Sequence, residues 1–405
     1  MAQKKVSMQI LCAQEEKRQA MTLDFIASEN YMPASVRRFM GSVLAHKYAE
    51  GYPGRRYYPG CGIVDEVEQE TQRRALDLFS LSARAWGVNV QPYSGSIANL
   101  AVYAALLKPG DTVLAPALAA GGHLSHGSKA SFSSKIFSFV SYGIDDAYHI
   151  DYHALRRLVL EHRPRLIISG ASAYPFRIDF KKIGLLAKEV GAIHMADVSH
   201  YAGLISAKQY PTPFLYADVV MSTTHKSLFG PRGAMLFFRK QYEAAIQKAV
   251  FPGLQGGPHM HTIAAIGEGL SYAKKHKSYY QQVMRNAARM AQQLSKQGLP
   301  LIGSGTQSHQ VLVHTAPMGM HGDQAQELLE RMGILANKNM IASDVSPQSP
   351  SAIRLGTYAV TARGMKEREI DRIAEIIAIT IRTGVVSAEN IKTVVALCKK
   401  FPLPR

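Results

Sequence analysis

Residues 218–233 read DVVMSTTHKSLFGPRG and have the features of a ligand-binding turn at the end of a strand. The apolar run Val219–Met221 is typical of a buried strand, and the glycines and proline after Lys226 are typical of a turn. In open α/β sheets ligands bind where strands end, and a partly desolvated lysine there can react with a carbonyl group. A lysine after a strand is more often a solvated loop residue, so this segment alone favours a site at Lys226 without establishing one.

The chain before this segment alternates between patterns typical of strands and patterns typical of helices. This alternation predicts the α/β class, with a mostly parallel sheet and helices on both faces. Asp197 ends one of the strands, where a carboxylate is either a cap or a partner for the ring nitrogen of a cofactor. The predicted strands are Asp111–Leu114, Lys135–Tyr142, Arg165–Ser169 and Ala192–Asp197, and the predicted helices are Tyr152–His162 and Ile183–Val190.

The chain is expected to divide into three segments. Residues 1–45 would form an N-terminal helical arm, residues 46–275 a large ligand-binding domain, and residues 276–405 a smaller C-terminal α/β domain. The boundary near residue 276 follows the charged run AKKHKS, which interrupts the apolar pattern.

Within these segments, apolar residues in most stretches recur at the period of a helix or of a strand. Helices are expected over residues 1–19, Ser35–Leu44, Ile63–Leu78 and Tyr279–Leu294, and strands over His309–Thr315 and Ser351–Tyr358. Tyr48–Gly62 is too rich in Gly, Pro and Tyr for a regular element. Near the end of the chain four isoleucines recur at the spacing of one helical face: Ile370, Ile373, Ile377 and Ile381.

Composition excludes several classes of protein. The 405 residues are 47% hydrophobic, which suits a globular protein with a substantial core. No apolar run approaches the roughly 20 residues that span a bilayer, and the polar start does not resemble a signal peptide, so a cytoplasmic protein without a membrane partner is expected. Cys12, Cys61 and Cys398 match no metal-ligand spacing, and no metal site is expected.

The net charge of +17 raises the question of nucleic-acid binding. The basic residues are scattered in pairs such as Arg55-Arg56 and Lys274-Lys275 rather than gathered into one arm. This favours a generally basic surface, which attracts anionic substrates, over a nucleic-acid site.

Residues 92–96, PYSGS, precede the apolar, alanine-rich stretch Ile97–Leu107. A turn of small residues that opens a helix suits a phosphate group, because free backbone N–H groups and the helix dipole face the anion. Many helices start at Ser-Gly, so the pattern is weak by itself. The chain has no GxGxxG or GxxxxGK[ST] motif, and dinucleotide and Walker-type sites have no local support.

Several other segments stand in a fixed order along the chain: IASENY at Ile26–Tyr31, KYAEGYPG and RYYPGC within Lys47–Cys61, NVQPYSGS at Asn89–Ser96, GGHLSHG at Gly121–Gly127, DVSH at Asp197–His200, FPGLQGGP at Phe251–Pro258 and IRLGT at Ile353–Thr357. Together with STTHKSLFGPRG, this set resembles the serine hydroxymethyltransferase family. The resemblance covers most of the chain. It implies the aspartate-aminotransferase-like fold of pyridoxal-phosphate enzymes (fold type I), with a seven-stranded, mostly parallel sheet in the large domain.

The resemblance implies an enzyme that moves the hydroxymethyl carbon of serine to tetrahydrofolate and releases glycine. Lys226 would hold pyridoxal 5'-phosphate, Asp197 would pair with its ring nitrogen, and His123 would stack on its ring. The further implied cofactor contacts are Ser94, Gly95, Ser172, His200, Tyr48 and Gly257. His225 and Thr223, which precede the lysine, are implied as catalytic residues.

The resemblance also assigns the two substrates. Arg354 would bind the carboxylate of serine through its planar fork, with Ser28 nearby. Glu50 would be the acid–base group, with Tyr58 beside it. The segment around Tyr48 and Glu50 would reach the partner's site, which implies a homodimer with shared active sites. The implied folate contacts are Leu118, Gly122, His123, Leu124, Asn339, Ser346, Pro347 and Gln348.

The chain departs from the family pattern at a few positions. Tyr93 and Ile97 stand where His and Gln are usual, Ser199 where Ala is usual, Tyr358 where Pro is usual, and Gln348 where Phe is common. The cofactor residues are intact, so the departures bear on the second substrate. A folate-independent β-hydroxy-amino-acid aldolase and an α-methylserine hydroxymethyltransferase stay open as alternatives, as does a basic RNA-binding protein without enzymatic activity.

Overall fold

The computed structural model describes residues 7–344, 346 and 349–404. The chain groups into two compact units. The first, here called the sheet unit, comprises Met32–Gln281 and Met340–Ser343. The second, the terminal unit, comprises the described parts of Met1–Tyr31, Gln282–Asn339 and Asp344–Arg405. These units are compact groups of contacts, and such groups do not test whether each unit folds independently. The three-segment division with boundaries near residues 46 and 276 stays a prediction.

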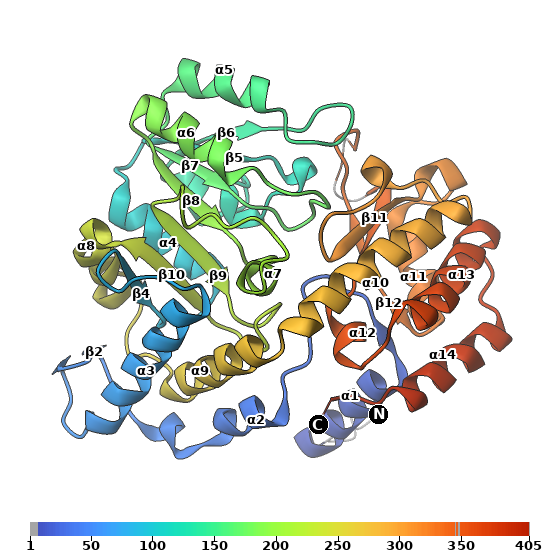
Figure 1. Cartoon of the computed structure of the whole chain (residues 1–405), viewed down its shortest axis with the longest axis horizontal. Helices are drawn as coiled ribbons and strands as arrows, with labels where there is room; N and C mark the ends of the chain where they lie inside the picture. Colours follow the sequence, from blue (N-terminus) through green and yellow to red (C-terminus); the bar gives the residue numbers. More distant parts are fainter. Residues whose placement is uncertain (1–6, 345, 347–348, 405) are drawn as a thin grey trace, which may run out of the picture. The chain divides into compact units, whose positions relative to one another are not determined.

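The sheet unit is built on one seven-stranded sheet in the order β4-β10-β9-β8-β7-β5-β6 (Figure 1). Only β10 is antiparallel to its neighbours, β4 and β9, and the other neighbouring pairs are parallel. This confirms the predicted α/β class with a mostly parallel sheet. The strands are β4 Trp86–Asn89, β5 Thr112–Pro116, β6 Ser138–Tyr142, β7 Leu166–Ser169, β8 Ile193–Asp197, β9 Val219–Thr223 and β10 Ala234–Arg239.

Helices cover both faces of this sheet, as the sequence predicts. Ile193 and Met195 on β8 join a core cluster with residues of α4 (Gly95–Leu106) and α8 (Glu243–Lys248). On the opposite face of β8, a Cβ at Gly184 of α6 (Phe180–Val190) would lie 3.3 Å from His194 Nδ1. Burial of each such aliphatic side chain stabilises the fold by about 1.5–3 kcal/mol relative to leaving the side chain exposed to water. The two apolar layers therefore hold the strand ends in place.

Two expectations for the N-terminal third are wrong. Ser35–Leu44 is not one helix: α2 (Ala34–Arg37) gives way to short 3₁₀ turns at Arg38–Gly41 and Val43–His46, because Ser42 between them is extended. Tyr48–Gly62 does contain regular structure, the hairpin β2 (Gly51–Tyr52) and β3 (Arg55–Arg56). The first helix, α1, runs over Met8–Met21 and belongs to the terminal unit. The other helices of the sheet unit are α3 Gly62–Leu78, α5 Tyr152–His162, α7 Ala202–Ser206 and α9 Met260–Lys275.

The terminal unit has a three-stranded antiparallel sheet in the order β11-β14-β13. A short parallel pair joins β1 (Leu23–Asp24) to β12 (Ile334–Leu335). The predicted isoleucine face is confirmed, because Ile370, Ile373, Ile377 and Ile381 of α13 are all buried in one cluster. The further elements are α10 Lys277–Lys296, β11 Gln310–His314, α11 Gly322–Arg331, β13 Asn337–Asn339, β14 Ala352–Gly356, α12 Tyr358–Ala362, α13 Glu367–Thr383 and α14 Ala388–Lys400.

Candidate active site

Lys226 follows β9 at the carboxyl edge of the sheet and is only 8% exposed. Its turn is closed on both sides: the Thr224 hydroxyl donates to the Pro231 carbonyl at 2.6 Å, and Gly230 N–H donates to the Thr224 carbonyl at 2.9 Å. The lysine is therefore a buried amine on a rigid turn rather than a solvated loop residue. Burial also lowers the pKa of the neighbouring His225 to about 3, with the charge of Lys226 acting in the same direction.

Asp197 ends β8, the strand next to β9, and its carboxylate is buried. His126 Nε2 lies 3.1 Å from Asp197 Oδ2, and Asn99 Nδ2 donates to the same oxygen at 3.3 Å. His126 Nδ1 accepts a hydrogen bond from the His123 amide, so its proton sits on Nε2 and points at the carboxylate. Burial opposes ionisation of Asp197, but the hydrogen bond from His126 and nearby positive charge hold the pKa of Asp197 well below its usual value.

The predicted phosphate turn lies beside the end of β9. α4 begins at Gly95, and the Ser94 hydroxyl caps it by accepting from Ile97 N–H at 3.4 Å. A Cβ at Gly95 would lie 2.7 Å from Thr223 Cγ2, so only glycine permits this approach of helix to strand. The first N–H groups of a helix lack partners inside it and attract anions. The turn and Lys226 therefore share one edge of the sheet.

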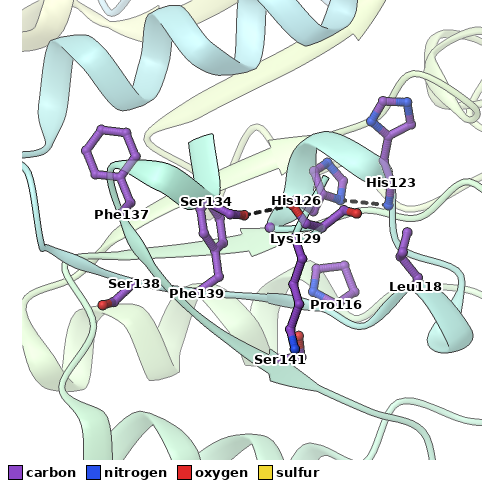
Figure 2. A pocket seen from close by; sticks show the side chains of 12 residues that line it. Pro116, Leu118, His123, His126, Lys129, Ser134, Phe137, Ser138, Phe139 and Ser141 are labelled. Atoms are coloured by element: carbon purple, nitrogen blue, oxygen red, sulfur yellow. Dashed lines mark hydrogen bonds between the residues drawn. The ribbon is translucent and has the colours of Figure 1, made fainter. Parts of the chain in front are cut away.

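The loop after β5 carries His123, Leu118, Gly122 and Leu124. Gly122 is confined by the backbone, since a Cβ there would lie 2.2 Å from the Pro116 carbonyl oxygen. The loop walls a cavity of about 490 Å³ whose lining includes Leu118, His123 and His126 (Figure 2). Burial lowers the pKa of His123 to about 4, which keeps its ring neutral at neutral pH. Leu118 and Leu124 are exposed, and Gly122 is buried.

Ser172 and His200 lie on neighbouring turns at the same edge. Ser172 follows β7, and its N–H donates to the Gly121 carbonyl at 2.6 Å. His200 is buried three residues after Asp197. The sheet topology therefore brings the carboxyl ends of β4, β5, β7, β8 and β9 together, with a predicted cofactor residue after each of them.

A second cluster contains the residues assigned to the partner's site. The rings of Tyr48 and Tyr58 lie 4.9 Å apart, and a Cβ at Gly257 would lie 3.3 Å from the Tyr48 ring. A Cβ at Gly256 would lie 3.2 Å from Glu50 Oε1. The hairpin segment and the glycine turn, about 200 residues apart in the chain, are thus neighbours within the sheet unit.

Four predicted site residues belong to the terminal unit. Arg354 lies on β14, is 8% exposed, and its Nε donates to Asn337 Oδ1 at 3.0 Å. Asn339 ends β13. Ser28 lies in a turn closed by Glu29 N–H and the Ile26 carbonyl at 2.9 Å, and the Ser346 carbonyl accepts from Ser349 N–H at 3.3 Å. Pro347 and Gln348 lie outside the described residues.

His126 and Asn99 both contact Asp197, although neither residue is among the site residues predicted from the sequence. A signal for Asn99 was present: it is a polar residue in an apolar helix, four positions after Gly95 and therefore on the same face. The sequence does not distinguish His126 from His123. Only the fold decides which of the two rings reaches the strand end.

A further buried histidine, His194, makes the stability of the protein dependent on pH. Its Nδ1 lies 3.1 Å from the Tyr216 carbonyl and its Nε2 lies 2.8 Å from the Ser169 hydroxyl, so the neutral ring satisfies both partners. Burial lowers the pKa of His194 from 6.5 to about 4. Between these values the unfolded chain binds a proton that the folded chain does not.

The melting temperature is therefore expected to fall as the pH is lowered from 7 toward 5. One such group removes up to about 1.4 kcal/mol of unfolding free energy per pH unit below 6.5. Calorimetry at several pH values checks this, with His194→Asn as the comparison, because asparagine does not titrate. A variant that loses stability as steeply as the wild type would exclude His194 as a source of the dependence.

The comparisons with known proteins show the family of this chain. Among the described helices, none has the length and apolar character required to cross a membrane. A family model described as serine hydroxymethyltransferase matches residues 1–377. A serine hydroxymethyltransferase of Desulfotalea psychrophila is 46% identical over 400 residues, which cover 97% of this chain and 93% of that protein. The chain therefore belongs to the serine hydroxymethyltransferase family, fold-type-I enzymes that use pyridoxal 5'-phosphate and transfer the hydroxymethyl carbon of serine to tetrahydrofolate, giving glycine.

Proposed function

We propose that this chain performs the transfer at the carboxyl edge of the seven-stranded sheet, with Lys226 and Asp197 as the central pair. One observation carries the proposal: a buried amine and a buried carboxylate follow two adjacent strands, β9 and β8. The hydrogen bond from His126 and nearby positive charge hold this carboxylate ionised, and a buried amine at a strand end can react with an aldehyde. A pyridine ring with an aldehyde at one end and a protonated nitrogen at the other uses both.

The surrounding polar atoms fit pyridoxal phosphate. Thr223 Oγ1, His225 Nδ1 and Asn99 Oδ1 are buried without a hydrogen-bond partner in the part of the chain that the structure describes. Buried polar atoms of this kind usually have a partner, so they support a polar ligand at this place. The residues that would hold the cofactor are Lys226 at its aldehyde, Asp197 at its ring nitrogen, His123 on its ring face, Ser172 and His200 at its oxygen substituents, and Ser94 and Gly95 at its phosphate.

When bound, the cofactor supplies an electron sink for the amino acid. The protein residues supply the rest. Asp197, held ionised, keeps a proton on the ring nitrogen. His225 and Thr223 flank the lysine and would orient its amine. In the second cluster, Glu50 would take the proton from the hydroxyl of serine and return it, with Tyr58 limiting the access of water.

The homodimer with shared active sites is part of this proposal. Val43, Tyr48, Tyr57 and Ile63 are each more than half exposed, which is unusual for large apolar side chains and suits burial against a second copy. Tyr48 and Gly257 would complete the phosphate site of the partner. The terminal unit would form the small C-terminal domain of fold type I. A cytoplasmic location without nucleic-acid or membrane partners completes the proposal.

Folate would bind at the loop after β5, where Leu118 and Leu124 present exposed apolar side chains and Gly122 lets the loop pack closely against the Pro116 carbonyl. Asn339, Ser346, Pro347 and Gln348 are kept as folate contacts on the family resemblance alone. The test is the formation of glycine from serine with and without tetrahydrofolate. A large gain with tetrahydrofolate is expected. Equal rates would instead support the folate-independent aldolase, and turnover of α-methylserine in preference to serine would support the other alternative.

Arg354→Lys is expected to keep the cofactor and lose affinity for serine. An ammonium group cannot make the two parallel hydrogen bonds that a guanidinium makes with a carboxylate. The expected loss is about 2–4 kcal/mol, or roughly 30- to 700-fold in kcat/KM. Titration of serine against the cofactor absorbance checks this. Wild-type affinity in the variant would remove Arg354 from the substrate site.

A further inference from the structure

The side chain of Arg56 is buried in a charged network that the mechanism above does not use. Its Nη2 lies 2.7 Å from Glu68 Oε2, and its Nε lies 2.8 Å from Asp65 Oδ1. The side chains of Arg56 and Glu68 are 3% and 0% exposed. A buried ion pair of this kind is often no more stable than apolar residues of the same volume. Its presence therefore calls for a reason other than stability.

The remaining donors of Arg56 point at the backbone on both sides of Glu50. Nη1 donates to the Ala49 carbonyl at 2.9 Å and to the Gly51 carbonyl at 2.7 Å. The Glu50 carbonyl itself accepts from Tyr57 N–H at 3.0 Å. Three consecutive peptide groups are thus held by the second strand of the hairpin, and Glu50 has little freedom to rotate about its backbone.

The same network extends to the glycine turn that lies beside Glu50. Gln91 Nε2 donates to Glu68 Oε1 at 2.9 Å and to the Gly51 carbonyl at 3.1 Å. The Gln91 carbonyl accepts from Gln255 Nε2 at 3.0 Å, one residue before Gly256. Arg56, Glu68 and Gln91 therefore connect the backbone at Glu50 to the turn against which its carboxylate packs.

We propose that Arg56 is a positioning residue that fixes the carboxylate of Glu50 for proton transfer, with Glu68 and Gln91 holding Arg56 in place. This inference rests on the acid–base role proposed for Glu50. Arginine is required because four of its five N–H donors serve Asp65, Glu68, Ala49 and Gly51 at once. A lysine keeps the charge against Glu68 but has three donors on one nitrogen and cannot reach both sides of Glu50.

The test compares Arg56→Lys with Arg73→Lys in the holoenzyme. Arg73 is a matched control, because it also pairs with a carboxylate, Glu70, but is exposed on α3. Misplacement of a catalytic group by about 1 Å can cost about 100-fold, so Arg56→Lys is expected to lower kcat by roughly 10- to 100-fold. The KM for serine and the affinity for the cofactor should stay within about threefold, because neither ligand contacts Arg56 in the proposed site. Arg73→Lys should match the wild type.

The decisive readout is a double-mutant cycle with Glu50→Gln, measured on single turnovers. If Arg56 acts through Glu50, Arg56→Lys should change the residual rate of Glu50→Gln by less than about threefold, because there is no carboxylate left to position. If the rate losses of Arg56→Lys and Glu50→Gln instead multiply in the double variant, Arg56 acts independently of Glu50. That result would overturn the inference. Full activity of Glu50→Gln alone would instead refute the proposed role of Glu50, so the two failures are distinguishable.

A second variant guards against misfolding of Arg56→Lys. The double variant Arg56→Gln, Glu68→Gln removes both fully buried charges together. Asp65 loses its arginine, but its side chain is 19% exposed and still accepts a hydrogen bond from Gly54 N–H. This double variant should melt close to the wild type while losing activity to a similar extent as Arg56→Lys. If it folds and has the kcat of the wild type, the inference is overturned.

Discussion

Lys226→Ala is expected to abolish serine hydroxymethyl transfer, with a loss on the order of 10⁴-fold or more, the scale seen when a covalent catalytic group is removed. The reason is that Lys226 is the buried amine that follows β9, next to the carboxylate of Asp197. Borohydride reduction of the wild-type holoenzyme, followed by peptide mapping, should place the cofactor on Lys226.

The control for this experiment is Lys188→Ala, which removes an exposed lysine from α6 and should leave activity and labelling unchanged. Alanine at position 226 is also a mild change for the fold, because the turn is held by the Thr224 hydroxyl and the Gly230 N–H. Recovery of the cofactor on a different lysine would overturn the assignment of the whole site.

Complementation between two inactive variants is the second expected result. Glu50→Gln lacks the proposed acid–base group and Lys226→Ala lacks the proposed cofactor amine, so each variant is expected to be nearly inactive by itself. If the sites are shared, a mixed dimer holds one site with both defects and one site with neither. Random exchange makes half of the dimers mixed, so activity should rise toward about a quarter of the wild type per subunit.

Subunit exchange needs its own measurement, for example native mass spectrometry of one variant carrying a tag. Mixing Glu50→Gln with a second variant of the same residue, Glu50→Ala, is the matched control, since every site in the mixed dimer then lacks the Glu50 carboxylate. Confirmed exchange without recovery of activity in the first mixture would mean that Glu50 serves the site of its own chain.

The local hydrophobic pattern was sufficient to predict the strands that position the candidate site. The apolar run before Ser222 predicted β9, and the runs that end at Ser169 and Asp197 predicted β7 and β8 within a residue. These strands are buried on both faces and are therefore nearly continuous in apolar residues, a signal that depends only on neighbouring positions. A sheet of parallel strands brings their carboxyl ends to one edge, so the alternation of elements was sufficient to predict Lys226 and Asp197 at the same edge.

Only the tertiary structure decided which side chains meet across long distances in the chain. His126 reaches Asp197 over 71 residues, and Arg354 pairs with Asn337 across two antiparallel strands. β10 inserts between β4 and β9 in the opposite direction, which no local pattern indicates. The network of Arg56 joins the hairpin, α3 and the end of β4. Propensity and hydrophobic period describe each residue's own environment, whereas these contacts depend on strand order, and strand order is set by the packing of the whole sheet.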